Sequence, residues 1–331
     1  MSLRMRVYAP IYRHPEMTKK SMKARTGQWL TIMAHAVAVM TFTYGSLQPA
    51  NAANQPLAKV QLMHVHGLSY SADGTKIFIP SHRGLAIYGQ GHWSTADGAP
   101  HDFMGFSATR DALYSSGHPA PGTNLVNPFG LIKSSDGGHT WKKLGFEGQS
   151  DFHIMAASYG TNTVYVLNES PNDRMTKSGI YVTQTDGAQW TTAEGKGLTG
   201  SINTLAAHPT NPKVLAAGTD KGLYISEDGA NHFQLSQSGE QVLAIGFDLD
   251  GSHLWYSHYA GKPALTRINW QNSKETQNIP LPPMTNDAVA YIAQNPITQS
   301  QIAIATFERS VYLSEDLGQT WKQIAKNGQT L

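Results

Sequence analysis

The sequence predicts an all-β fold of six four-stranded blades arranged as a β-propeller, and three observations lead to it. An eight-residue pattern, S-x-D-x-G-x-T-W, recurs along the chain. Short runs of strand-favouring residues, divided by turn residues, group into units of four strands. An extra strand is expected at residues 57–63, where it can pair with the last unit and close a ring. Repeats of about 40 to 50 residues are typical of radial and solenoid folds.

The recurring pattern is clearest at residues 134–141 and 314–321. Residues 226–233 keep its spacing but lose the glycine, threonine and tryptophan, and residues 183–190 are a divergent copy with the aspartate one place late. In such a segment the aspartate accepts hydrogen bonds from the backbone of a tight turn, and the glycine supplies a positive φ. The tryptophan packs between neighbouring sheets. The pattern therefore marks a turn that stabilises the fold and not an active site.

The six units follow one another with the same layout. Units one (about 64–98) and five (about 241–279) lack the octapeptide and carry other turns, at 89–93 and 269–272. Unit two, residues 102–146, has a long insertion between its second and third strands. The strands expected in unit three are 154–159, 163–167, 179–183 and 189–193. Those in unit four are 202–207, 214–217, 222–226 and 232–235, and those in unit six are 289–293, 302–306, 310–314 and 320–324.

Six units of four strands make a β-propeller, in which ring closure removes most exposed strand edges. Seven blades would need a further unit of about 40 residues, and the sequence offers none. Residues 53–331 are accordingly expected to form one propeller domain.

Residues 1–52 are predicted to be a secretory signal peptide. The basic segment holds Lys19, Lys20, Lys23 and Arg25. A short apolar run, 29–44, follows it, and Ala50-Asn51-Ala52 fits a cleavage site that leaves Ala53 as the first mature residue. The short apolar run favours export over a membrane anchor. We expect a secreted or periplasmic protein with no membrane insertion after cleavage.

Composition excludes several classes of function. The chain has no cysteine, so it has no lipoprotein anchor, disulfide or thiolate metal site. Its net charge is only +2, and no Lys/Arg run follows residue 25, which argues against nucleic acid as a partner.

The histidines sort to one end of the predicted propeller. The loops that enter the first strand and leave the second strand of each blade lie on one face, around the central funnel; we call this face the funnel mouth. His258 falls there in blade five. Blades one to three contribute the candidate metal ligands His64, His66, His82, His101, His118 and His153.

Converging neutral imidazoles without thiols suit a Zn²⁺ or copper site. Period-two alternation is expected to place His64 and His66 on one face of a strand. Asp102 and Asp151 are candidate ligands, or acceptors that orient the imidazole rings. The thioethers of the nearby methionines Met104, Met155 and Met175 would favour copper. The alternative is that the histidines are ordinary loop residues and the methionines are core side chains.

The octapeptide resembles the Asp-box, or bacterial neuraminidase repeat (BNR), and from His64 to Trp190 the chain resembles secreted bacterial Asp-box proteins labelled glycosyl hydrolase or sortilin-like. The resemblance is carried by residues 64–68, 101–106, 115–122, 127–131 and 151–156. It implies a propeller with the box between the third and fourth strands of a blade. It implies no proven reaction, because one fold hosts many functions.

A sialidase-like activity is not expected. That family uses an arginine triad, but only Arg83 and Arg309 fall in funnel-end loops of this chain. Another glycoside hydrolase activity stays open, since it needs two carboxylates that face one bond. The candidate catalytic carboxylates are Asp102, Asp151 and Glu169.

A third possibility is a non-catalytic periplasmic binding or assembly scaffold, with the proline-rich insertion 117–128 as a lid or docking arm. The leading hypothesis is metal-dependent binding, with copper or zinc, of a small-molecule, glycan or peptide ligand at the funnel mouth. Whether the protein is an enzyme stays open.

Overall fold

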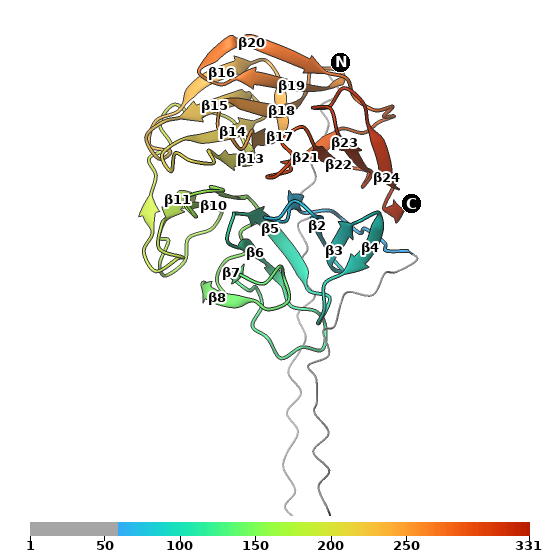
Figure 1. Ribbon diagram of the computed structural model, residues 1–331. Helices are drawn as coiled ribbons and strands as arrows, with labels where there is room; N and C mark the ends of the chain where they lie inside the picture. The colour runs from blue at the N-terminus through green and yellow to red at the C-terminus, as the bar shows by residue number, and fades with distance from the viewer. Residues whose placement is uncertain (1–58) are drawn as a thin grey trace, which may run out of the picture. The chain divides into compact units, whose positions relative to one another are not determined.

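The computed structural model describes residues 59–331, so the predicted signal peptide and its cleavage site lie outside the described residues. The described strands form six antiparallel sheets, one for each predicted unit (Figure 1). No described residue belongs to a helix, and therefore none belongs to a helix suited to crossing a membrane. The predicted six-bladed β-propeller is confirmed.

Each blade runs outward from its first strand, which lies nearest the centre. Blade one consists of β1 (Ser69–Tyr70), β2 (Lys76–Ser81), β3 (Gly84–Gly89) and β4 (His92–Thr95). Blade two consists of β5 (Asp102–Ala108), β6 (Leu113–His118), β7 (Leu131–Ser134) and β8 (Lys142–Gly145). Blade three consists of β9 (Met155–Ala157), β10 (Val164–Asn168), β11 (Gly179–Thr183) and β12 (Thr191–Thr192).

The remaining blades follow the same order. Blade four consists of β13 (Ile202–Ala207), β14 (Leu215–Thr219), β15 (Gly222–Ser226) and β16 (Gln234–Ser238). Blade five consists of β17 (Gln241–Phe247), β18 (His253–Tyr259), β19 (Pro263–Asn269) and β20 (Asn272–Ile279). Blade six consists of β21 (Val289–Gln294), β22 (Ile302–Thr306), β23 (Val311–Ser314), β24 (Lys322–Lys326) and β25 (Gln329–Thr330).

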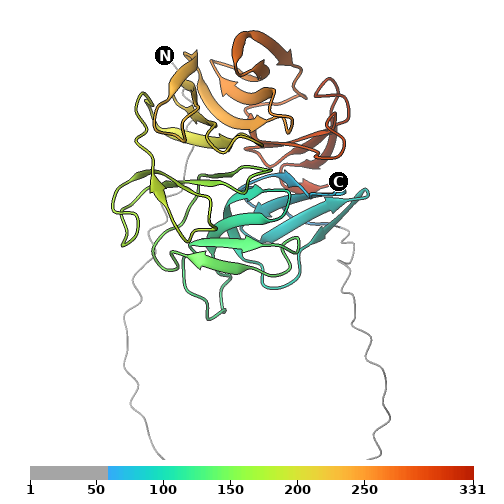
Figure 2. The ribbon, with the colours of Figure 1, turned by 60° about the vertical axis from the view of Figure 1, so that its left-hand side comes forward.

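The two ends of the described chain close the ring. The innermost strands contact one another in sequence, and β1 of blade one contacts β21 of blade six. The blue and red strands accordingly lie side by side in Figures 1 and 2. Gln61 pairs with Gln329, and the Leu62 N–H donates to the Gly328 carbonyl at 2.8 Å. The predicted pairing of the leading segment with unit six is confirmed, but it is made through the unpredicted strand β25.

A hydrophobic cluster fills each junction between neighbouring blades. At the junction of blades one and two, Phe78 and Leu85 pack with Phe103 and Leu113. The other five junctions hold equivalent clusters. Burying one such side chain stabilises the fold by about 1.5–3 kcal/mol. The core is therefore divided among six interfaces, which hold the first strands and their loops in fixed positions.

The octapeptide turns have the expected geometry between the third and fourth strands. Asp136 accepts hydrogen bonds from the backbone N–H and the hydroxyl of Thr140, and Asp316 does the same with Thr320. In the divergent copy Thr185 takes the place of the aspartate, and Asp186 instead binds Tyr114 and Lys133 of blade two.

Three of the outermost strands begin later than predicted, and one of them is β12, which begins at Thr191, where residue 189 was expected. β16 begins at Gln234, where residue 232 was expected, and β24 begins at Lys322, where residue 320 was expected. The reason for β16 and β24 is that Asp228 and Asp316 still hold the backbone of His232 and Thr320 inside the turn.

Candidate functional site

Three side chains from blades one and two meet at the funnel mouth: His66, His82 and Asp102. One nitrogen or oxygen of each lies within 4.8 Å of those of the other two. The His82 Nδ1–H donates to Asp102 Oδ2 at 2.5 Å, and His66 Nε2 lies 3.7 Å from Asp102 Oδ1. All three are mostly buried, with 17% of the His66 side chain exposed. We call this set the first group.

Local backbone pairing brings the first group together. The His66 N–H donates to the Pro80 carbonyl, and the His82 N–H donates to the Met63 carbonyl. The segment that enters blade one therefore lies against the end of β2. Gly67 permits this path, because a Cβ there would come within 2.7 Å of Phe106.

His64 stands at the edge of the first group. Its ring centroid lies 4.8 Å from that of His82 and 6.5 Å from that of His66. His64 and His66 do not lie on a strand, so the predicted alternation does not apply; His64 has a φ of 47° that bends the chain. Burial, together with the charge of His82, lowers the pKa of His64.

Hydrogen bonding in the first group is incomplete. His66 Nε2 and Asp102 Oδ1 are both buried, and neither has a hydrogen-bond partner among the described residues. Leaving such atoms unpaired costs about 1–3 kcal/mol each. Burial lowers the pKa of His66 to about 4 even though Asp102 opposes the shift. The ring is therefore neutral near pH 7 and keeps a lone pair.

Blades two and three form a second group from His118, Asp151 and His153. Nε2 of His118 and Nε2 of His153 both donate to Asp151 Oδ2, at 2.9 and 2.6 Å. Phe152 lies fully in the core between blades two and three, so Asp151 and His153 on either side of it project away from that core. The second group occupies blade positions like those of the first, since each joins the end of one blade's second strand to the entry of the next blade.

The second group makes the hydrogen bonds that the first group lacks. The other ring nitrogen of His118 donates to Asn127 Oδ1 at 2.6 Å, and Ser116 donates to Asp151 Oδ1. The bond to Asp151 raises the pKa of His118 to about 9 and also raises that of His153. Burial opposes ionisation of Asp151, but the two histidine bonds outweigh it and lower its pKa. The second group is thus a carboxylate held between two imidazole rings, of which that of His118 is protonated near pH 7.

The six histidines grouped from the sequence do not all converge. His101 lies outside both groups, with its Nδ1 accepting the Ala120 N–H at 2.9 Å and its ring 5.0 Å from that of Phe129. Asp102 follows it on β5, and adjacent residues of an extended segment project to opposite sides. The two could therefore not share one site.

The three methionines are buried, and Met155 also lines the central cavity that His66 and His153 line. Met155 and Met175 pack in the hydrophobic core between blades two and three, and Met104 is buried as well. The alternative interpretation of these residues, as core side chains, agrees with their burial.

The candidate catalytic carboxylates differ in their surroundings. The lowered pKa of Asp151 does not suit a general acid, which needs a raised one. Glu169 is exposed, and its charge contributes to the raised pKa of His153. Asp102 is engaged by His82, as described above.

Sequence reasoning missed two polar partners at this face. Asn127, from the insertion of blade two, holds His118. Glu240 Oε2 lies 2.7 Å from His258 Nδ1 at the entry of blade five, although neither buried atom makes a hydrogen bond to the described residues. No sequence pattern marks Asn127 as a funnel-mouth residue. Glu240, by contrast, directly precedes the first strand of its blade, and residues at that position of a blade are expected at the funnel mouth.

The first strands of all six blades also line a central cavity of about 230 Å³. Its walls are mainly small and neutral side chains, and His66 and His153 lie among the lining residues. Each group of ligands therefore contributes one histidine to the wall of this cavity.

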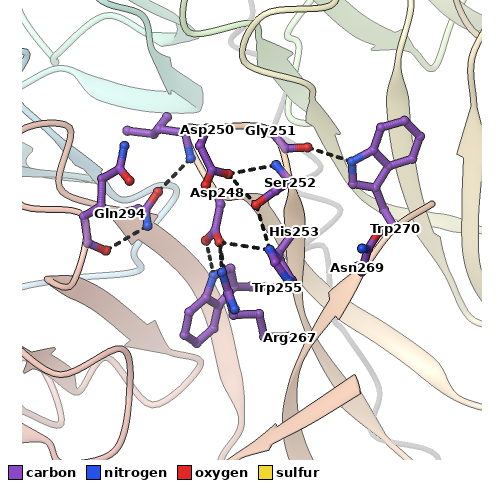
Figure 3. Close-up of polar contacts among 12 residues, drawn as sticks. Asp248, Asp250, Gly251, Ser252, His253, Trp255, Arg267, Asn269, Trp270 and Gln294 are labelled. Atoms are coloured by element: carbon purple, nitrogen blue, oxygen red, sulfur yellow. Dashed lines mark hydrogen bonds and ion pairs between the residues drawn. The ribbon is translucent and has the colours of Figure 1, made fainter. Parts of the chain in front are cut away.

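A third Asp–His arrangement lies in blade five, and there both carboxylate oxygens are hydrogen-bonded (Figure 3). Asp248 is 2% exposed and accepts hydrogen bonds from Trp255 Nε1 and from Arg267, whose Nε lies at 2.9 Å. His253 Nδ1 lies 3.9 Å from the same carboxylate. This network joins β18 and β19 to the end of β17 and leaves neither carboxylate oxygen unpaired.

Comparison with known proteins supports the architecture. No protein-family model matches the chain, and no curated protein matches it in sequence. A GH74 enzyme from Niastella koreensis matches with a TM-score of 0.55 and 14% identity, over 81% of this chain and 46% of that one. The present chain thus spans less than half of that enzyme.

Two further solved structures are similar. A chain of a nidogen/laminin complex matches with a TM-score of 0.57 and 11% identity, over 75% of this chain and 91% of that one. YCF48 from Cyanidioschyzon merolae matches with a TM-score of 0.50 and 16% identity, over 82% and 87% of the two chains. At such identities these likenesses show the fold alone.

Proposed function

We propose that this protein binds a metal ion through His66, His82 and Asp102 and uses it to bind a further ligand at the funnel mouth. The observation that carries the proposal is the pair of buried, unpartnered atoms, His66 Nε2 and Asp102 Oδ1. Buried polar atoms in native proteins nearly always have a partner, so an unpaired pair that faces a common point calls for an explanation.

The separation of these two atoms fits an ion between them. At 3.7 Å they are too far apart for a hydrogen bond. Two ligands of a tetrahedral Zn²⁺ ion, each about 2.0–2.2 Å from the metal, are about 3.4 Å apart. A small inward movement would therefore satisfy both atoms through one ion.

The donor set suits zinc or copper. Two imidazoles and one carboxylate form a combination that catalytic zinc sites use, and imidazole also suits copper. The buried methionines give no additional support to copper. Three protein ligands leave a fourth position for a small molecule, glycan or peptide. Because His66 also lines the central cavity, that ligand would enter through the funnel mouth.

We assign the metal to the first group because the second is internally saturated. A metal in the second group would have to displace the protons that bind His118 and His153 to Asp151. In the first group His66 is already neutral, so binding there requires less proton release.

We also infer that the protein is exported and related to the Asp-box propellers. The two complete octapeptide turns, with aspartate holding threonine, support the second inference. The predicted signal peptide supports the first. Amino-terminal sequencing of the protein from the periplasmic fraction tests export, with Ala53 as the expected first residue.

Metal analysis of the purified protein tests the proposed function. After reconstitution with Zn²⁺ or Cu²⁺ and removal of excess ion, we expect one ion per chain. His66→Ala and His82→Ala should each lower the occupancy at least tenfold. His92→Ala, a change of an exposed histidine in β4, is the matched control and should bind like the wild type. Equal metal content in all four proteins would reject the site.

A further inference from the structure

We propose that a second cavity, between blades one and two, binds a small amphipathic anion with an aromatic or aliphatic body and a carboxylate. It has a volume of about 310 Å³ and lies under the insertion of blade two. That volume is at the lower end of the range of small-molecule sites, whereas the central cavity falls below it. The proposal does not depend on the metal.

The walls of this cavity are apolar and rich in aromatic rings. They include Leu85 of blade one and Phe103, Phe129 and Trp141 of blade two. Phe103 and Trp141 are tilted by 32° with ring centroids 4.9 Å apart, so they present a fixed aromatic surface. Such walls are the main component of sites for drug-sized ligands.

The charged residues that line the cavity are mostly cationic. Arg83 has no carboxylate partner among the described residues, and Lys143 is only loosely paired, 3.8 Å from Glu147. The lining carboxylate of Asp97 is already paired with His139 at 3.2 Å. An anionic group is therefore favoured at this edge, and arginine pairs well with carboxylates.

His101 supplies a neutral polar group to the same wall. Its Nδ1 accepts the Ala120 N–H, so the ring proton is on Nε2, which has no partner among the described residues. A few placed polar groups on an apolar wall fix the orientation of a ligand.

The insertion of blade two leaves apolar side chains exposed at the edge of the cavity. It is anchored at its ends, where the Phe129 N–H donates to the Gly117 carbonyl and Ala120 binds His101. Between these anchors Leu125 lines the cavity but remains 42% exposed, and its neighbour Val126 is 50% exposed. The apolar body of a ligand would cover Leu125.

The cavity lies directly behind the first group. His82 and Asp102 belong to the first group, and their neighbours Arg83 and His101 line the cavity. The same two backbone segments thus serve both sites, and their side chains project to opposite sides.

Titration with 4-phenylbutyrate tests the proposal, with its uncharged amide as the comparison and a chelator present throughout. We expect saturable binding that changes the Trp141 environment, observed by calorimetry and by NMR of the tryptophan indoles. The amide should bind at least about fivefold more weakly. Because no metal is available, failure here would leave the proposed metal site untouched.

Variants locate the binding. Arg83→Gln should weaken the acid about fivefold but hardly affect the amide. Leu125→Ser should weaken both by about threefold or more. Leu235→Ser removes another exposed leucine, in blade four, and should leave both affinities unchanged. No saturable binding, or equal affinity for acid and amide in wild type and Arg83→Gln, would overturn the proposal.

Discussion

Two aspartates of this propeller, the partly buried Asp102 and the buried Asp248, lie beside histidines but have different surroundings. Asp248 is enclosed by Arg267 and Trp255, which supply strong donors to both of its oxygens (Figure 3). Asp102 receives one hydrogen bond from His82, and its second oxygen faces an equally unpaired nitrogen of His66. One carboxylate completes a structural network, whereas the other leaves two atoms for something else to bind.

The contrast between the two aspartates distinguishes a residue that stabilises the fold from one that is available to bind a ligand. A buried charge that has all its donors is costly to disturb, because removing it leaves the partner unpaired. A buried atom without a partner already carries that cost, so its removal is inexpensive in the absence of a ligand. Residue type alone does not distinguish the two cases; the hydrogen-bond partners of each carboxylate oxygen do.

The largest expected effect is at Asp248. Asp248→Ala leaves Arg267 without its partner and should lower the free energy of unfolding by about 3–5 kcal/mol. Asp102→Ala, measured without metal, should lower it by about 1 kcal/mol or less. Urea denaturation of both variants tests the difference, and equal losses would remove the distinction between the two aspartates.

Metal should stabilise only the protein with an intact first group. At a metal concentration of one hundred times Kd, the wild type should gain about 2.7 kcal/mol. His66→Leu should lose this gain, yet without metal it should remain within about 1 kcal/mol of wild type, because no hydrogen bond is removed. Thermal unfolding with and without metal measures both. A variant that unfolds without metal but binds it normally would show that His66 is structural.

The second group should contribute stability in a defined pH range. His118, with its pKa raised to about 9, stabilises the fold fully below its ordinary value of 6.5 and loses this effect as the pH rises through 9. Asp151, with a lowered pKa, contributes above its ordinary value of 3.8 and loses the effect in acid. The difference in Tm between wild type and Asp151→Asn should be largest near pH 5–6 and small above pH 9. A difference independent of pH would contradict the ion-pair description.

The smallest expected effect is at an octapeptide turn. Asp136 is fully bonded, like Asp248, but it lies on the surface. Asp136→Asn should therefore cost about 1 kcal/mol. Chemical denaturation measures this loss, and a cost equal to that of Asp248→Ala would mean that burial does not decide the size of the effect.

Most of the fold could be predicted because its sequence pattern repeats from blade to blade. The octapeptide sets the spacing of third and fourth strands, and alternating runs locate the others, so all six blades follow from local sequence. Strand β25 was missed because it is only two residues long and follows a tight turn at Asn327 and Gly328, both with positive φ.

The candidate site was predictable in place but not in detail. The positions of His66, His82 and His118 relative to the strands of their blades place them at the funnel mouth. The pairing of His82 with Asp102, however, depends on contacts between blades. His101 was placed wrongly although it directly precedes Asp102, and adjacent residues of an extended segment project to opposite sides. The more complete hydrogen bonding of the second group depends on Asn127, and no sequence motif identifies Asn127 as a partner of His118.

A crystal structure of the zinc-loaded protein, with anomalous data at the zinc edge, tests the central claim most directly. The account predicts one anomalous peak about 2.0–2.2 Å from His66 Nε2 and from an Asp102 oxygen. A peak bound only by His118 and His153, or no peak at the funnel mouth, would contradict it.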